Sequence, residues 1–155
     1  MYPEVTKIKH AKELLYNQFQ ADFGSELHVD KLEKGRIETY TTNHPNGALV
    51  VFYDGGKFSD STSINIVRTN RDLRFVAFLK IKIEKGLTYR DDMIDAVVDS
   101  VSGLKFITVS KADRVRPSAD EYATPEADGD KSFYDHPIVL IVPAQFVQKK
   151  HLNED

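Results

Sequence analysis

The chain of 155 residues contains no cysteine. This absence excludes disulfide bonds, catalytic thiols and thiolate metal sites. Long apolar runs are missing as well: those present, such as residues 48–53 and residues 138–142 between two prolines, are far shorter than the roughly 20 residues that a spanning helix needs. The first residues show no apolar run behind a basic start. We therefore expect neither a signal peptide nor a membrane partner.

A large excess of charge of one sign is also absent. The chain has 21 Lys and Arg residues against 24 Asp and Glu residues, which gives a net charge of −3 at pH 7. Such a chain generates no global field that would hold DNA or an anionic membrane, so a nucleic-acid binder that works by bulk charge is excluded. Hydrophobic residues make up 41% and charged residues 29%, which is the composition of a globular domain rather than of a disordered chain.

Motifs that carry chemistry are missing too. None of the five histidines lies in an HExxH-type pair, and no GxSxG elbow is present. Residues 54–57 follow a predicted strand but lack the phosphate-loop pattern, so we interpret them as a tight turn. His44 and His136 each precede a proline, and we expect both to be exposed. The sequence predicts no enzymatic activity and no cofactor.

One acidic pattern leaves an alternative open. Asp91, Asp95 and Asp99 recur every four residues and would share one face of a helix. Such a face can attract a divalent cation with help from other ligands, which would make the chain a small metal-dependent enzyme. We favour a solvated stripe opposite an apolar one, because carboxylates in a first helical turn are also stabilised by the helix dipole.

Apolar residues at spacings of three and four predict two helices. The first covers residues 8–23, with Thr6 as its N-cap and Gly24 as a left-handed residue that ends it. The second covers residues 88–102 and ends at Gly103.

Alternating or continuous apolar residues predict the strands, which we place at residues 27–32, 37–40, 48–53, 64–69, 73–84, 104–115 and 133–142. We interpret residues 59–63 as an exposed polar loop, residues 117–131 as a long mobile acidic loop, and residues 148–155 as a loose tail. The order of elements predicts an α+β fold, with a mostly antiparallel or mixed β-sheet and two packed helices. We assign residues 1–155 to a single domain, whose ordered core covers residues 5–146.

Residues 47–58, GALVVFYDGGKF, resemble a signature of a family of Mu-like contractile-phage tail proteins. The resemblance continues through residues 71–75, through Tyr89 and residues 92–101, and through a closing apolar strand. The order of elements is also similar to the tail-terminator fold of long-tailed phages, a small sheet with helices packed on it. The acidic residues 117–131 and the Ser59-Asp60 pair depart from the family pattern.

The resemblance implies a structural virion protein with no chemistry of its own. Tail terminators form hexameric rings on the last ring of tail-tube subunits, end tail polymerisation and offer a docking surface to the head connector. The implied partners are other copies of the chain, the tail tube protein, the tail sheath protein and the head–tail connector or completion protein. DNA would pass through the ring without sequence-specific binding.

The implied location is the tail or neck of the virion, with assembly in the host cytoplasm. Another component of the same neck, a head–tail connector or a tail-completion protein, remains an alternative.

A closed ring needs two different complementary patches on each subunit. We place the first patch at the predicted loop of residues 55–63 with nearby arginines, and the second at the acidic helix or the acidic loop. The residues predicted for these contacts are Gly55, Gly56, Lys57, Ser59, Asp60, Arg68, Arg71, Asp91, Asp95 and Asp128.

Overall fold

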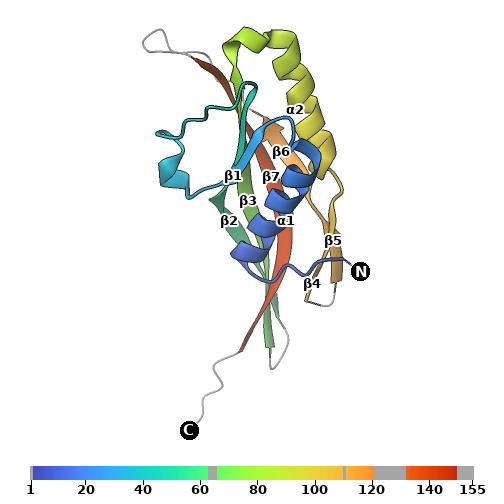
Figure 1. The fold of residues 1–155 in the computed structure, drawn as a ribbon. Coiled ribbons are helices and arrows are strands. Elements are labelled where there is room, and N and C mark those ends of the chain that lie inside the picture. Colours follow the sequence, from blue (N-terminus) through green and yellow to red (C-terminus); the bar gives the residue numbers. More distant parts are fainter. Residues whose placement is uncertain (1, 63–65, 110, 121–131, 150–155) are drawn as a thin grey trace.

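A computed structural model describes residues 2–62, 66–109, 111–120 and 132–149. Two helices, α1 (Ile8–Phe23) and α2 (Leu87–Val101), pack on one face of a five-stranded sheet, as Figure 1 shows. The order of strands in the sheet is β1-β2-β3-β7-β6, in which β1 is parallel to β2 and all other neighbours are antiparallel. The predicted α+β fold with a mixed sheet is confirmed.

The strands of this sheet differ greatly in length. They are β1 (His28–Lys31), β2 (Gly47–Thr62), β3 (Ile66–Lys82), β6 (Arg116–Asp120) and β7 (Phe133–Lys149). A separate hairpin consists of β4 (Lys105–Thr108) and β5 (Lys111–Arg114), and short 3-10 helices occur at η1 (Lys34–Arg36) and η2 (Ile83–Lys85). The predicted strand at residues 104–115 is therefore a hairpin, and the strand predicted at residues 37–40 is absent.

The main core lies between the two helices and the sheet. Phe19 on α1, Phe75 on β3 and Phe106 on β4 are among its largest fully buried side chains. Burial of a side chain of this size contributes about 1.5–3 kcal/mol each. The strict alternation predicted along β3 is confirmed, since every second residue from Leu73 to Ile81 is fully buried on the helix-covered face.

A smaller cluster covers the opposite face of the sheet. Phe52, Val76 and Val139 are buried there, and Ile37 packs against them from the segment after η1. Residues 48–52 of β2 are consequently buried on both faces, as the continuous apolar run predicted.

The helix ends differ from the sequence prediction in two places. The residue that precedes α1 is Lys7 rather than Thr6, and no side chain caps this end. Gly24 has φ −60°, which is right-handed, so it does not end α1 by a left-handed turn. Gly103 after α2 has φ +76°, the conformation that glycine adopts most readily.

The largest difference is the length of β2, β3 and β7. Residues 54–62 continue β2 instead of forming a turn and a polar loop, and β3 joins two predicted strands into one. A bulge between Tyr53 and Gly56 accommodates the glycine pair, with Gly55 at φ +98°. Backbone hydrogen bonds to a neighbouring strand require no apolar side chain, so polar residues remain in the ladder when a partner strand is present.

The predicted acidic loop and tail are also shorter than expected. Residues 116–120 pair with β7 as strand β6, so the predicted loop does not begin at Pro117, and its residues 121–131 lie outside the described residues. Strand β7 extends to Lys149, and the rest of the predicted tail likewise lies outside the described residues.

His136 contradicts the expected exposure. It is only 5% exposed, on β7, with Nε2 at 3.4 Å from a carboxylate oxygen of Asp120 on β6.

Candidate assembly surfaces

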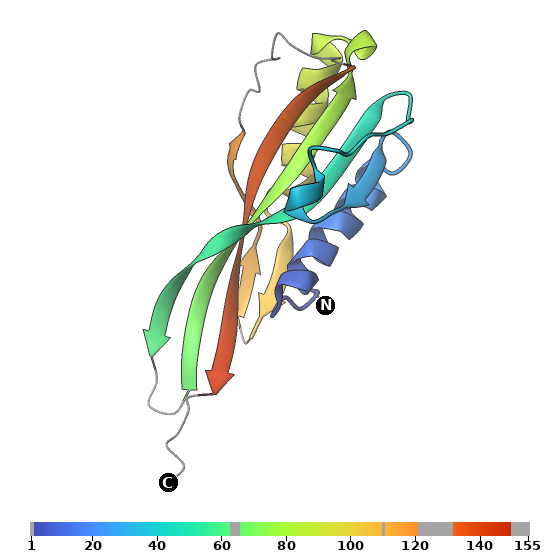
Figure 2. The same cartoon turned by 90° about the vertical axis from the view of Figure 1, so that its left-hand side faces the viewer.

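The distal parts of β2, β3 and β7 form a three-stranded ribbon that extends past both helices (Figure 2). We term this ribbon the arm; it comprises residues 56–62, 66–72 and 143–149. Its strands are joined by continuous pairing, with Phe58 opposite Arg71 and Arg71 opposite Ala144. The arm therefore has a complete backbone ladder but no helix that covers it.

Seven of the residues predicted for subunit contacts lie on the arm or at its base. Five are on β2 and two on β3, in paired segments: Gly55, Gly56, Lys57, Ser59, Asp60, Arg68 and Arg71. The structure thus brings this predicted patch together, but as a ribbon rather than as a loop. The other predicted residues do not join it, because Asp91 and Asp95 lie on α2 and Asp128 lies outside the described residues.

The base of the arm is organised around Arg71. Its guanidinium carbon lies 4.7 Å from the ring centroid of Phe58, 5.6 Å from that of Phe146 and 5.8 Å from that of Tyr53. Its Nη2 donates a hydrogen bond to the Tyr53 hydroxyl at 2.7 Å. Such a cation on aromatic faces is worth about 0.5–2 kcal/mol per contact, so Arg71 stabilises the base of the arm.

Phe58 leaves much of its ring in solvent. Its side chain is 62% exposed, more than any other large apolar side chain in the described part of the molecule. A single exposed aromatic residue beside an arginine is a composition that protein interfaces favour.

One edge of the arm is open. Strand β1 pairs with β2 only at residues 48–51, and the amide of Leu32 adds one hydrogen bond to the Val51 carbonyl at 3.0 Å. Beyond Val51, no strand in the described ranges pairs with this edge of β2. An unpaired edge of this length is a template for a strand from another chain.

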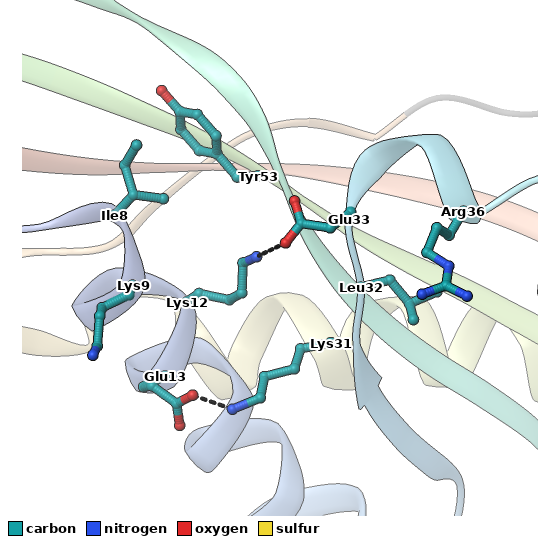
Figure 3. A pocket seen from close by; sticks show the side chains of 9 residues that line it. All are labelled: Ile8, Lys9, Lys12, Glu13, Lys31, Leu32, Glu33, Arg36 and Tyr53. Atoms are coloured by element: carbon teal, nitrogen blue, oxygen red, sulfur yellow. Dashed lines mark hydrogen bonds and ion pairs between the residues drawn. The ribbon is translucent and has the colours of Figure 1, made fainter.

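A cleft of about 600 Å³ lies beside α1, between its first turns, β1, η1 and the base of the arm (Figure 3). We term it the basic cleft; its lining residues are Ile8, Lys9, Lys12, Glu13, Lys31, Leu32, Glu33, Arg36 and Tyr53. Two ion pairs cross it: Lys31 contacts Glu13, and Lys12 Nζ lies 3.4 Å from a Glu33 carboxylate oxygen. The sequence prediction missed this cleft, because its charged residues come from separate elements and form no linear motif.

The exposed face of α2 is acidic, and we term it the acidic face. Its members are Asp91, Asp92, Asp95 and Asp99, all of them exposed. Asp91 accepts hydrogen bonds from Arg90, with the shorter at 2.9 Å. Across the described ranges, no group of three or more His, Asp or Glu side chains is arranged to hold a metal ion. Asp91, Asp95 and Asp99 therefore do not form a metal site by themselves.

None of the helices in the described residues is long and apolar enough to cross a membrane.

The comparisons with known proteins point to one family. No curated protein matches the chain. The model of the Gp37 protein family matches residues 17–155, which include all of the described strands, the second half of α1 and the whole of α2. The chain therefore belongs to the Gp37 protein family, a phage-related family.

Proposed function

We propose that this chain is a phage tail terminator, a structural virion protein that forms a ring on the end of the tail tube. The ring would end tail polymerisation and offer the docking surface for the head connector. The observation that carries this proposal is the arm, a projecting ribbon with an open edge and an exposed Phe58 at its base.

The arm favours assembly for an energetic reason. The β4–β5 hairpin packs on the base of the arm, where the Thr108 hydroxyl exchanges hydrogen bonds with the backbone of Gln145. Beyond this base the ribbon projects away from the packed layers (Figure 2), so it adds little to their buried apolar area. Natural sheet proteins shorten or block such edges unless another strand uses them. An arm of this length is therefore best explained as a surface that a neighbouring subunit or a tail protein covers.

Membership of a phage-related family supports the same function. It agrees with the resemblance of residues 47–58 to tail proteins of Mu-like contractile phages. The proposed partners are other copies of the chain, the tube and sheath proteins and the head–tail connector, and the proposed location is the neck of the virion.

Light scattering with and without purified tail tube protein tests this function. We expect a six-fold ring, either from the chain alone or only when tube ends are present, and electron microscopy should show the ring at one end of each tube. A strictly monomeric chain that ignores tubes would contradict the proposal. Binding to a head connector without binding to tubes would favour the other neck components instead.

A metal titration tests the enzymatic alternative. Added Mg²⁺ or Ca²⁺ should leave the melting temperature unchanged, because the carboxylates of the acidic face lack further ligands among the described residues. A rise that disappears in an Asp95→Asn/Asp99→Asn variant would instead support a metal-dependent enzyme.

A further inference from the structure

We propose that the basic cleft of one copy binds the acidic face of α2 from the next copy in the ring. This inference rests on the proposed ring function and assigns the two surfaces by which its subunits meet. The observations that carry it are the positions of the two surfaces and their unpaired charges.

The two surfaces belong to elements that lie toward opposite ends of the sheet, although α1 and α2 also pack against each other. The cleft is built by α1, β1 and η1, and β1 forms one end of the five-stranded sheet. Helix α2 packs beside β6 and β7 at the other end of the sheet. In Figure 1, η1 lies on the left of the molecule, β1 near the middle and α2 on the right. Two different surfaces of this kind make a head-to-tail contact, which is the geometry that closes a ring.

The cleft carries an excess of positive charge. Four cationic side chains and two carboxylates line it, so its net charge is +2. Lys12 and Lys31 are already engaged with the two carboxylates. Lys9 and Arg36 are exposed and have no ion-pair partner within the described ranges. Figure 3 shows these two residues on opposite sides of the cleft, Lys9 on α1 and Arg36 on η1.

The position of Lys9 is unfavourable for the isolated subunit. It lies in the first turn of α1, which has no acidic residue, and Lys7 precedes it. A cation at this end of a helix opposes the helix dipole, and the effect is about 0.3–1 kcal/mol. The charge of Lys9 does not stabilise the isolated subunit, but it would attract a negatively charged partner.

The acidic face likewise carries charges without partners, here negative ones. Asp92, Asp95 and Asp99 follow one another at spacings of three and four, so their carboxylates share one side of α2 and repel one another. No cation of the described ranges pairs with any of the three. A neighbouring subunit that brought two free cations to this side of the helix would relieve the repulsion.

Apolar side chains also line the cleft. Ile8 and Tyr53 lie at one edge of it and Leu32 lies near Arg36, as Figure 3 shows. Tyr53 also accepts the hydrogen bond from Arg71, so the same side chain contacts both the cleft and the base of the arm.

Charge reversal tests the contact. We expect Lys9→Glu/Arg36→Glu and Asp95→Lys/Asp99→Lys each to raise the dissociation constant of the ring by about tenfold or more, because like charges would then face each other. The chain that combines all four substitutions should recover most of the association. A matched control is Lys105→Glu/Arg114→Glu, which reverses two exposed cations that face each other on the β4–β5 hairpin. This control should assemble as the unmodified chain does.

The outcomes separate the inference from the proposed function. If the unmodified chain forms rings and both cleft and α2 variants do so equally well, the inference is wrong and the ring function stands. If the unmodified chain forms no ring with or without tubes, the ring function itself is wrong.

Thermal unfolding of each variant establishes that it is folded. Where a variant does not fold, the salt dependence of the unmodified ring replaces it: the dissociation constant should rise between about 0.05 M and about 0.5 M NaCl, and a salt-independent ring would overturn the inference.

Inorganic phosphate distinguishes a small-anion site from a subunit contact. Under our inference, phosphate at millimolar concentration binds weakly at the cleft and competes with ring formation. Tight phosphate binding that Lys9→Glu/Arg36→Glu abolishes while the ring remains intact would overturn it.

Discussion

Arg71 on the arm donates a hydrogen bond from Nη2 to the hydroxyl of Tyr53 at 2.7 Å. Tyr53 lies on β2 immediately before the bulge, and its ring packs on Phe75 in the main core with centroids 5.4 Å apart. The Nε atom of Arg71 is buried and has no hydrogen-bond partner in the described part of the chain. This bond therefore joins the packed layers to the arm, as the hydrogen bonds between Thr108 and the backbone of Gln145 also do, and it partly satisfies the guanidinium.

Replacement of Tyr53 by Phe should lower the free energy of unfolding by about 1–3 kcal/mol, because it leaves a second guanidinium nitrogen without its partner. Urea denaturation measures this loss. Tyr2→Phe is the control, since Tyr2 is exposed and its hydroxyl has no hydrogen bond to any described residue. In an Arg71→Met background, where the donor is already gone, Tyr53→Phe should cost much less, and an equal loss in both backgrounds would contradict this account.

Gly47 at the start of β2 should not tolerate a side chain. It has φ +133°, and a Cβ there would lie 1.9 Å from the carbonyl oxygen of Lys80 on the paired strand. We expect Gly47→Ala to destabilise the protein by about 3 kcal/mol or more. Gly35→Ala is the matched control, because a Cβ at Gly35 would meet no atom within 4 Å and the φ of this residue is not positive. Similar melting temperatures for the two variants would argue against the described β2–β3 pairing.

Phe58→Ser should weaken assembly much more than it weakens the subunit. Because the ring is 62% exposed, its loss should change the free energy of unfolding by only about 1 kcal/mol, mainly through the contact with Arg71. Sedimentation or light scattering should show fewer rings at the same concentration. Tyr2→Ser removes another exposed aromatic ring away from the arm and should leave the assembly unchanged. Normal assembly of Phe58→Ser would remove this residue from the interface.

Stability should fall at high pH. Burial raises the pKa of Tyr40 to about 12, with a further contribution from the nearby Asp30 carboxylate. Burial and the hydrogen bond that Tyr89 donates to Glu26 at 2.6 Å raise the pKa of Tyr89 well above its usual value. Both folded-state pKa values exceed the unfolded value, so their contribution is complete below about pH 10 and is lost as the pH rises toward about 12.

Urea denaturation at about pH 9 and about pH 11 measures this fall. Tyr89→Phe should reduce the difference between the two pH values, because it removes one of the two groups, whereas Tyr2→Phe should leave it unchanged. Equal stability at both pH values would contradict the prediction.

Local patterns were sufficient for the regular elements of the packed layers. The apolar spacing in α1 and the alternation from Leu73 to Ile81 predict their elements because side-chain burial repeats with the period of the backbone. The resemblance of residues 47–58 to phage tail proteins is confirmed at the level of a phage-related family, while the tail terminator remains a proposal.

The candidate surfaces were predictable only in part. Polar and basic residues such as Gly56, Lys57 and Arg71 marked the region of the arm in the sequence. Their composition predicted a loop there, whereas the structure has paired strands. The basic cleft had no such signal, since Lys9 and Arg36 belong to elements that are separated in sequence and brought together by packing.

By itself, the sequence determined the absence of thiol chemistry, and it predicted the two helices, the buried central strands and the likeness to a phage family. Those properties depend on residue types and on short-range periodicity. Only the tertiary structure decided that β2, β3 and β7 continue into an arm, that His136 is buried, and that charged residues from α1, β1 and η1 meet in the basic cleft. The physical reason is that backbone pairing and the meeting of distant charges depend on partners that no local pattern specifies.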